Sequence, residues 1–358
     1  MDTPYSNLPP SRYWRSGVAE ADPAKLEDLY TKKFEIGSDD RIATAGSCFA
    51  QHVARHMRAR NFKIVDTEQL PDWVPPALAK EYGYQLYSAR YGNIYTIRQL
   101  RQLLADSLSG TVRSEDVWEK NGRYYDALRP SVEPDGLDSV DEVLEHRRYH
   151  LGRVKLMLEQ TDVLVITLGL TEAWQRLDTG TVYPTAPGVI AGQFDDAKFG
   201  FVNFDFFEIY NDLVAIRETL LAMKPNIRFL LTVSPVPLTA TASGDHILIA
   251  STRSKSILRT VCSMLKDKFD NIDYFPSFEI ITSPGAKSRF YESNLRSVKE
   301  EGVDAVMGIF FASHKPSGAI DVVERQADGP AKRRKKRRVE VTDEDVVCED
   351  ALLEAFQK

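Results

Sequence analysis

Residues 41–60 read RIATAGSCFAQHVARHMRAR, and this stretch decides the fold class. Its first seven residues form an apolar run of strand length. Phe49, Val53 and Met57 then recur every four residues, which is the period of an amphipathic helix. A strand that leads directly into a helix is the repeating unit of a parallel α/β sheet. The turn at Gly46 and Ser47 therefore lies at the carboxyl end of the first strand.

The alternation of apolar strands and helical segments continues along the chain. We expect further strands at residues 62–65, 163–169, 228–236 and 272–281. We expect helices at residues 49–60, 97–107, 140–160, 206–224, 249–269 and 298–311, and loop-rich stretches at 70–134, an insertion or lid, and 178–203. The pattern predicts a three-layer α/β/α sandwich of flavodoxin-like type with a mainly parallel sheet. One domain would occupy residues 1–315 and a flexible tail residues 316–358.

The composition is that of an ordinary globular protein, with 43% hydrophobic and 27% charged residues. No apolar run approaches the roughly 18 residues that a membrane span needs. The first residues lack the basic and apolar pattern of a secretory signal, so we expect a cytoplasmic protein. Cys48, Cys262 and Cys348 are too few and too scattered for a disulfide framework or a zinc site. We expect neither a metal nor a cofactor.

The net charge of −6 conceals a run of seven basic residues from Lys332 to Arg338. Without this run the chain carries 39 basic and 52 acidic residues, a net charge of −13. Nucleic-acid binding requires a basic face, so the body of the protein does not fit that class. We expect a weak polyanion contact through Lys332 to Arg338.

Two interpretations of Ser47 follow from its place in the first turn. A serine just before a helix N-terminus lies close to free N–H groups and a partial positive charge, which stabilise an oxyanion. The same position is also that of an ordinary helix cap, for which serine is a preferred residue. Cys48 is either a small buried residue or an alternative nucleophile, because helix N-termini activate thiols.

Several segments, in order, resemble the GSCFA-domain family of bacterial proteins. They are GSCFA (46–50), YGNIYTIRQL (91–100), TLGLTEAW (167–174), YPTAPG (183–188), LLTVSPVPLTATAS (230–243), SKSILR (254–259) and YFPSFEII (274–281). The resemblance covers residues 10–311 and excludes the basic tail. The family is grouped with the SGNH, or GDSL-like, hydrolases, so the resemblance implies a serine nucleophile after the first strand and an oxyanion hole.

Carried over by position, the resemblance assigns the nucleophile to Ser47. It assigns the oxyanion hole to the Ser47 N–H, to Gly92, which precedes Asn93, and to Thr171, which stands where related enzymes have asparagine. The usual Asp-x-x-His before the last helix is replaced by Asn-Leu-Arg-Ser at residues 294–297. A serine nucleophile without a base is nearly inert, so the base must come from elsewhere.

We expect His246 to be the general base, because it follows the fourth strand at the carboxyl edge. Glu172 or Asp245 would orient it. The other histidines are expected on solvated helix faces, at residues 52, 56, 146 and 150, or at the start of the tail, at residue 314.

Polar and aromatic residues near the same edge are candidates for substrate binding. Arg259, Lys255 and Arg296 could bind a substrate carboxylate or phosphate, or form ordinary surface ion pairs. Trp174, with Tyr183, could stack on sugar rings, or only pack locally. Asn93 completes this set of candidate binding residues.

The resemblance implies a serine-type esterase or O-acyltransferase. The substrate would be an acyl ester of carbohydrate, with a role in polysaccharide biosynthesis or modification. The alternative is a non-catalytic carbohydrate-binding or assembly protein on a degenerate SGNH fold, which the missing Asp-x-x-His favours. The sequence does not specify the oligomeric state.

Overall fold

The computed structural model describes residues 3–314, 352–353 and 356. Its central sheet consists of β1 (Arg41–Gly46), β2 (Lys63–Ile64), β5 (Val163–Leu168), β9 (Arg228–Val233) and β10 (Ile272–Tyr274). The order across the sheet is β2-β1-β5-β9-β10, and every neighbouring pair is parallel. This is the strand order of flavodoxin-like folds. The predicted α/β class is therefore confirmed.

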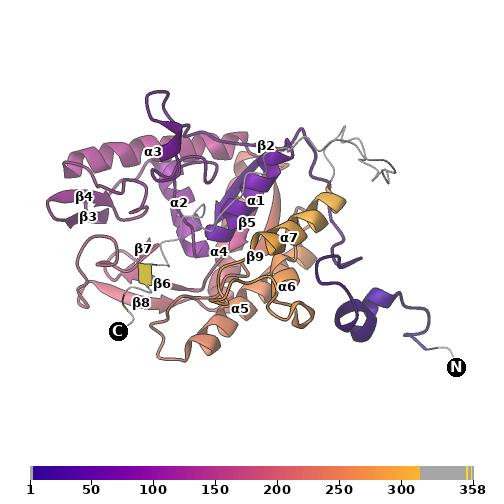
Figure 1. Ribbon diagram of the computed structural model, residues 1–358. Helices are drawn as coiled ribbons and strands as arrows, with labels where there is room; N and C mark the ends of the chain where they lie inside the picture. The colour runs from indigo at the N-terminus through magenta and orange to yellow at the C-terminus, as the bar shows by residue number, and fades with distance from the viewer. Residues whose placement is uncertain (1–2, 315–351, 354–355, 357–358) are drawn as a thin grey trace, which may run out of the picture.

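Helices cover both faces of the sheet (Figure 1). One face packs against α1 (Cys48–Ala59), α6 (Ser277–Thr282) and α7 (Glu300–Ser313). The other face packs against α2 (Ile97–Ser109), α3 (Val140–Gln160), α4 (Phe206–Met223) and α5 (Ile247–Lys268). Short helical turns are η1 (Pro10–Arg12), η2 (Arg15–Ala19), η3 (Pro76–Leu78), η4 (Ser114–Asp116) and η5 (Pro284–Ala286). The arrangement is the predicted three-layer sandwich.

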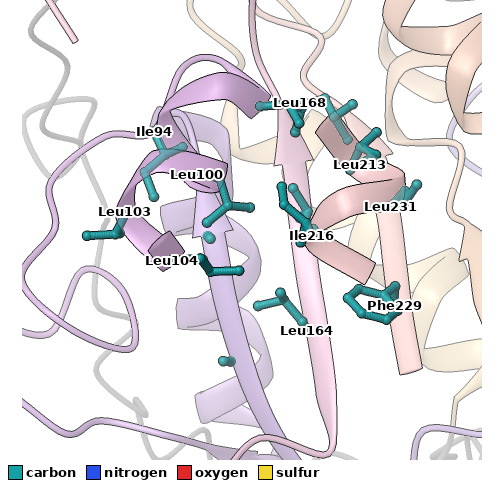
Figure 2. Close-up of a cluster of buried hydrophobic side chains, with 14 of the residues drawn as sticks. Ile94, Leu100, Leu103, Leu104, Leu164, Leu168, Leu213, Ile216, Phe229 and Leu231 are labelled. Atoms are coloured by element: carbon teal, nitrogen blue, oxygen red, sulfur yellow. The ribbon is translucent and has the colours of Figure 1, made fainter. Parts of the chain in front are cut away.

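The middle strand β5 shows why the sheet is buried on both faces. Leu164, Ile166 and Leu168 belong to the hydrophobic cluster under α2 to α5, and Val163 and Val165 to the cluster under α1, α6 and α7. Alternate residues of a strand point to opposite faces, so a strand covered on both sides needs a continuous apolar run. Figure 2 shows the first cluster, in which side chains of α2 and α4 meet β5 and β9.

The starts of three helices are fixed by side chains that accept backbone N–H groups. Thr96 and Gln99 form a capping box at α2, and Asp205 and Glu208 form another at α4. Ser139 accepts from the Glu142 N–H at α3. These caps explain why the predicted helix starts at residues 97, 140 and 206 agree with the structure.

Two small antiparallel sheets were not predicted. β3 (Val117–Lys120) pairs with β4 (Arg123–Asp126), and β6 (Glu172–Arg176) pairs with both β7 (Val182–Tyr183) and β8 (Phe199–Asn203). The expected loop at residues 178–203 therefore contains β7 and β8. The expected insertion at 70–134 contributes α2 to the main core, because Leu100 and Leu104 are buried there.

The predicted strand at 272–281 is wrong in its second half. The strand β10 ends at Tyr274, and α6 begins directly after Pro276. Proline has no N–H for a ladder but fits the start of a helix, so the chain changes structure there. In the same way β9 ends at Val233, before Pro235, instead of continuing to residue 236.

His314 closes the domain and is not the start of a solvated tail. It is fully buried, its Nδ1 accepts the Ile36 N–H at 3.2 Å, and its Nε2 lies 3.0 Å from the Tyr30 hydroxyl. The basic run Lys332 to Arg338 lies outside the described residues. No helix in the described part of the chain has the length and apolar character needed to cross a bilayer.

A buried ionic cluster joins Glu68 and the end of the 70–134 region to α3. His150 is fully buried, contrary to the predicted solvated face, and its Nδ1 lies 2.7 Å from a Glu68 carboxylate oxygen. Arg129 bridges Glu68 and Asp126, and Arg147 also approaches Asp126. Burial, with Arg129 next in importance, lowers the pKa of His150 to about 4. The imidazole is therefore neutral at physiological pH.

Candidate active site

Ser47 lies at the junction of β1 and α1, at the carboxyl edge of the sheet. It occupies the cap position of α1, but its side chain makes no capping hydrogen bond. The residue is only 4% exposed, and its Oγ has no hydrogen-bond partner within the described part of the chain. A buried hydroxyl without a partner is costly, so its presence calls for an explanation, and a catalytic role is one. The capping interpretation therefore lacks the bond that defines it.

Gly46 makes this turn possible. Its φ of +147° is one that side-chain-bearing residues rarely adopt, and a Cβ there would lie 2.4 Å from the Thr167 carbonyl oxygen. Gly46 is paired with Thr167 in the β1–β5 ladder, so neither backbone can move away alone. Only glycine lets the chain turn here while β1 and β5 remain in contact.

The segment 87–95 lies along the end of β1. The Ile94 N–H donates to the Gly46 carbonyl at 2.9 Å, and the Tyr87 hydroxyl donates to the Ser47 carbonyl at 3.2 Å. The predicted Asn93 accepts from Tyr87 and from Gln51, one turn into α1. Gly92 adopts a φ of +69° in the same segment. The structure therefore brings the Gly92–Asn93 pair beside the first turn of α1.

Gly169 follows β5 and faces Ser47 directly. A Cβ at this position would lie 3.1 Å from the Ser47 Cβ, 3.3 Å from its Oγ and 3.0 Å from the Tyr95 carbonyl oxygen. The next residue, Leu170, donates its N–H to that same carbonyl at 2.8 Å. A side chain at residue 169 would occupy the space around the hydroxyl.

Thr171 is buried and both of its donors have partners away from Ser47. Its N–H donates to Ser254 Oγ at 3.0 Å, and its hydroxyl donates to Asn203 Oδ1 at 2.8 Å. The bond to Ser254 holds α5 against the end of β5. In this arrangement Thr171 fixes the site but offers no free donor to an oxyanion.

Lys255 on α5, a candidate for binding a substrate anion or for a surface ion pair, is buried in a way that the sequence analysis did not predict. It is 5% exposed, and its Nζ donates to the Gly169 carbonyl at 2.7 Å. Its amine is therefore buried and does not lie at the surface. The buried positions of α5 include 251, 254, 255, 258 and 262. That spacing places a lysine on the apolar face of the helix, and this signal in the sequence could have identified it.

The predicted base does not meet Ser47 in the structure. His246 is an exposed residue that caps α5, and its Nδ1 accepts the Leu248 N–H at 3.2 Å. Nine residues separate it from Lys255, which is about 13 Å along a helix axis. Glu172 accepts from the Thr241 hydroxyl at 2.9 Å, and burial raises its pKa. Asp245 is exposed in the same loop.

Arg259 and Arg296, the two arginines predicted to bind substrate, make other contacts or lie in another segment. Arg259 pairs with Glu279 and stacks on the Tyr274 ring at 4.1 Å, so its guanidinium serves the packing of α5 on α6. Arg296 is half-buried in the loop before α7, in the segment where Asp-x-x-His was expected. The Cys48 side chain is buried at the first helical position of α1.

Leu170, the residue after Gly169, lines a cavity of about 230 Å³. Its wall is formed mainly by apolar side chains of β6, β8 and the loop after β9. Polar residues in the wall include Glu172 and Thr241. The apolar residues include Leu170, Ala173, Trp174, Phe201 and Leu238. Trp174 packs edge-on against Phe194 and Phe201. Leu353 completes the wall, and Figure 1 shows the short yellow piece at residues 352–353 beside β6. Tyr183 is buried on Trp118 and lies outside this wall.

Comparison with curated proteins finds no match. The model of the GSCFA family matches residues 41–310, which include the whole central sheet, the Ser47 turn, Gly169 and Lys255. This match covers more than half of the chain and agrees with the expectation from the separate sequence segments. The chain belongs to the GSCFA family.

Proposed function

We propose that this protein is a serine-type esterase or O-acyltransferase, built on an SGNH-like fold, that acts on acyl esters of carbohydrate. The observation that carries the proposal is the Ser47 hydroxyl, which is buried, unbonded and placed at the N-terminus of α1. Helix N-termini and free N–H groups stabilise negative charge, as the tetrahedral intermediate of acyl transfer requires.

The reaction would proceed in two steps. Ser47 Oγ attacks the ester carbonyl, the ester C–O bond breaks and the alcohol leaves, while the Ser47 and Gly92 N–H groups hold the oxyanion. A sugar hydroxyl or water then takes the acyl group from Ser47. Gly169 leaves room at the hydroxyl for the carbonyl carbon to approach.

The cavity supports a small ligand. Ligand pockets are largely apolar with a few polar groups, and this one combines Trp174 and Phe201 with Glu172. An aromatic ring can stack on a sugar face or contact an acyl chain. We place the substrate here because Leu170, which directly follows Gly169 in the chain, lines the cavity.

The decisive test is labelling with a fluorophosphonate probe, which reacts with activated serines. Wild type should be labelled, and Ser47→Ala should not, because its nucleophile is gone. Ser234→Ala is the matched control, since Ser234 is a buried serine directly after β9, which lies two strands from β1 in the same sheet. Cys48→Ala should also label as wild type. Unlabelled wild type, with no turnover of acetylated sugars, would refute the proposal.

Trp174→Ala should weaken substrate binding more than it slows the chemical step. Loss of a stacking ring is expected to raise KM about tenfold on an acetylated oligosaccharide, at a nearly unchanged kcat. Trp73→Ala is the control, because Trp73 is 83% exposed and does not line the cavity. Equal KM values for the two variants would remove the cavity from the proposal.

The alternative is a non-catalytic carbohydrate-binding or assembly protein. It is favoured by the absence of a histidine hydrogen bond to Ser47 within the described residues and by the engagement of both Thr171 donors. It predicts that Ser47→Ala binds oligosaccharide as wild type does and that neither protein turns over the ester.

The proposal extends to where the protein works and what else it contacts. We place it in the cytoplasm, on precursors of a polysaccharide, with a weak polyanion contact through the basic run Lys332 to Arg338. Cell fractionation and the salt dependence of binding to heparin or anionic vesicles would test these two points.

A further inference from the structure

We propose that Lys255 is the proton acceptor that serves Ser47 in place of a histidine. The inference rests on the proposed function and names the group that this function lacks. General acid–base catalysis by a lysine paired with a serine is a known solution on other folds. Here it follows from the contacts that Lys255 and Ser47 make with one residue, Gly169.

The side chains of Lys255 and Ser47 both lie close to Gly169. Lys255 Nζ lies 2.7 Å from the Gly169 carbonyl oxygen, and Ser47 Oγ lies 3.3 Å from the position that a Cβ would take. The Cβ and carbonyl oxygen of one residue are about 3 Å apart, so Nζ and Oγ lie within about 9 Å of each other. One or two water molecules, or rotation of the outer methylene groups of the lysine, would span that gap.

A proton acceptor must be a neutral amine at the moment of transfer. Lys255 is 5% exposed and shares the buried face of α5 with Leu258 and Cys262. Burial disfavours the charged form of an amine. A neutral amine keeps a lone pair that can accept the hydroxyl proton while its N–H still donates to the Gly169 carbonyl.

The position of Lys255 is fixed by its own neighbours. Ser254 accepts the Thr171 N–H, which ties α5 to the segment that follows Gly169. The amine is therefore held at the end of β5 by a bond that does not depend on the lysine itself. His246, at the exposed end of the same helix, has no such tie to Gly169 within the described residues.

The proton balance is complete with this one group. In the first step the Ser47 hydroxyl proton moves to the Lys255 amine as the Oγ–acyl bond forms, and the resulting ammonium protonates the leaving alcohol. In the second step the amine takes the proton of the acceptor hydroxyl, or of water, as it attacks the acyl carbon. The ammonium then returns that proton to Ser47 Oγ, and the enzyme is regenerated.

The test measures the rate of fluorophosphonate labelling across pH for Lys255→Arg, Lys255→Met and Lys255→Ala. Arginine keeps a donor for the Gly169 carbonyl but cannot accept a proton. We therefore expect the labelling rate of Lys255→Arg to fall by a factor of about 100 or more. Lys268→Arg and Lys268→Met, at an exposed position of α5, are the controls. Thermal unfolding identifies variants that do not fold.

A structural role and a proton-transfer role give different further readouts. If Lys255 accepts the proton, propylamine should restore labelling of Lys255→Ala at least tenfold but not that of Ser47→Ala. The wild-type pH profile should also lose one ionisation in Lys255→Arg. Slow labelling without rescue and with an unchanged pH profile would overturn the proposal, as would Lys255→Arg labelling within threefold of wild type.

The outcomes also separate this inference from the proposed function. Unlabelled wild type overturns both. Labelled wild type with unaffected Lys255 variants overturns only the role of Lys255. If His246→Ala slows labelling in that case, the base is His246.

Discussion

Gly46→Ala is expected to destabilise the protein by about 3 kcal/mol or more, which lowers Tm by roughly 6 °C or leaves the chain unfolded. Two costs add at this position. The residue has a φ of +147°, and its new Cβ would overlap the carbonyl oxygen of Thr167 on the neighbouring strand. Relief would require β1 and β5 to separate at the centre of the sheet.

Substitution of two other glycines measures the backbone cost and the steric cost separately. Gly110 also has a positive φ, +71°, but nothing lies within 4 Å of its Cβ position, so Gly110→Ala should cost about 1–2 kcal/mol from the backbone alone. Gly152 lies inside α3 in open space, so Gly152→Ala should stabilise by up to about 1 kcal/mol. Urea and thermal unfolding of the three variants give the comparison. A Gly46→Ala protein as stable as Gly110→Ala would contradict the described contact between β1 and β5.

The second large effect is a loss of stability between pH 6.5 and pH 4. Burial lowers the pKa of both His150 and His314 to about 4 in the folded protein, whereas an unfolded histidine titrates near 6.5. As the pH falls through this window the unfolded chain takes up protons that the folded chain does not. The free energy of unfolding should then fall by about 3 kcal/mol for each histidine.

Both histidines should contribute nothing to this slope above about pH 7, where they are neutral in both states. Glu68, whose pKa lies well below its usual range because of His150 and Arg129, adds a further loss below about pH 4.5. Urea titrations between pH 7.5 and 4.5 measure the slope. His314→Gln should reduce it by about half, and a free energy of unfolding that stays constant from pH 7 to 5 would show that the histidines are not buried as described.

The central sheet was predictable because its signals are local. Val163 to Leu168 is a continuous apolar run, and the helices at 97, 140 and 206 begin at capping residues that lie next to them in the chain. Such patterns depend on neighbours within a few residues. The turn at Gly46 and Ser47 was identified for the same reason.

What the sequence did not predict depends on contacts between distant residues. The strands β6 to β8 are short, and they pair with one another across loops rich in glycine and proline. Lys255 was expected either to bind a substrate anion or to form a surface ion pair, and its burial against Gly169 depends on the packing of α5, which the sequence does not show. His314 was assigned to the tail because its partners, Tyr30 and Ile36, lie at the other end of the sequence.

Those last contacts decide how short a piece of this chain can be expressed. The family match spans residues 41–310, yet the fully buried Asp273 accepts the Tyr30 hydroxyl and the Lys33 N–H, each at 2.8 Å. A fragment cut at the matched range would leave this carboxylate inside the core without those donors, and would also lack His314. The smallest piece that keeps its own interior satisfied begins before Tyr30 and ends after His314.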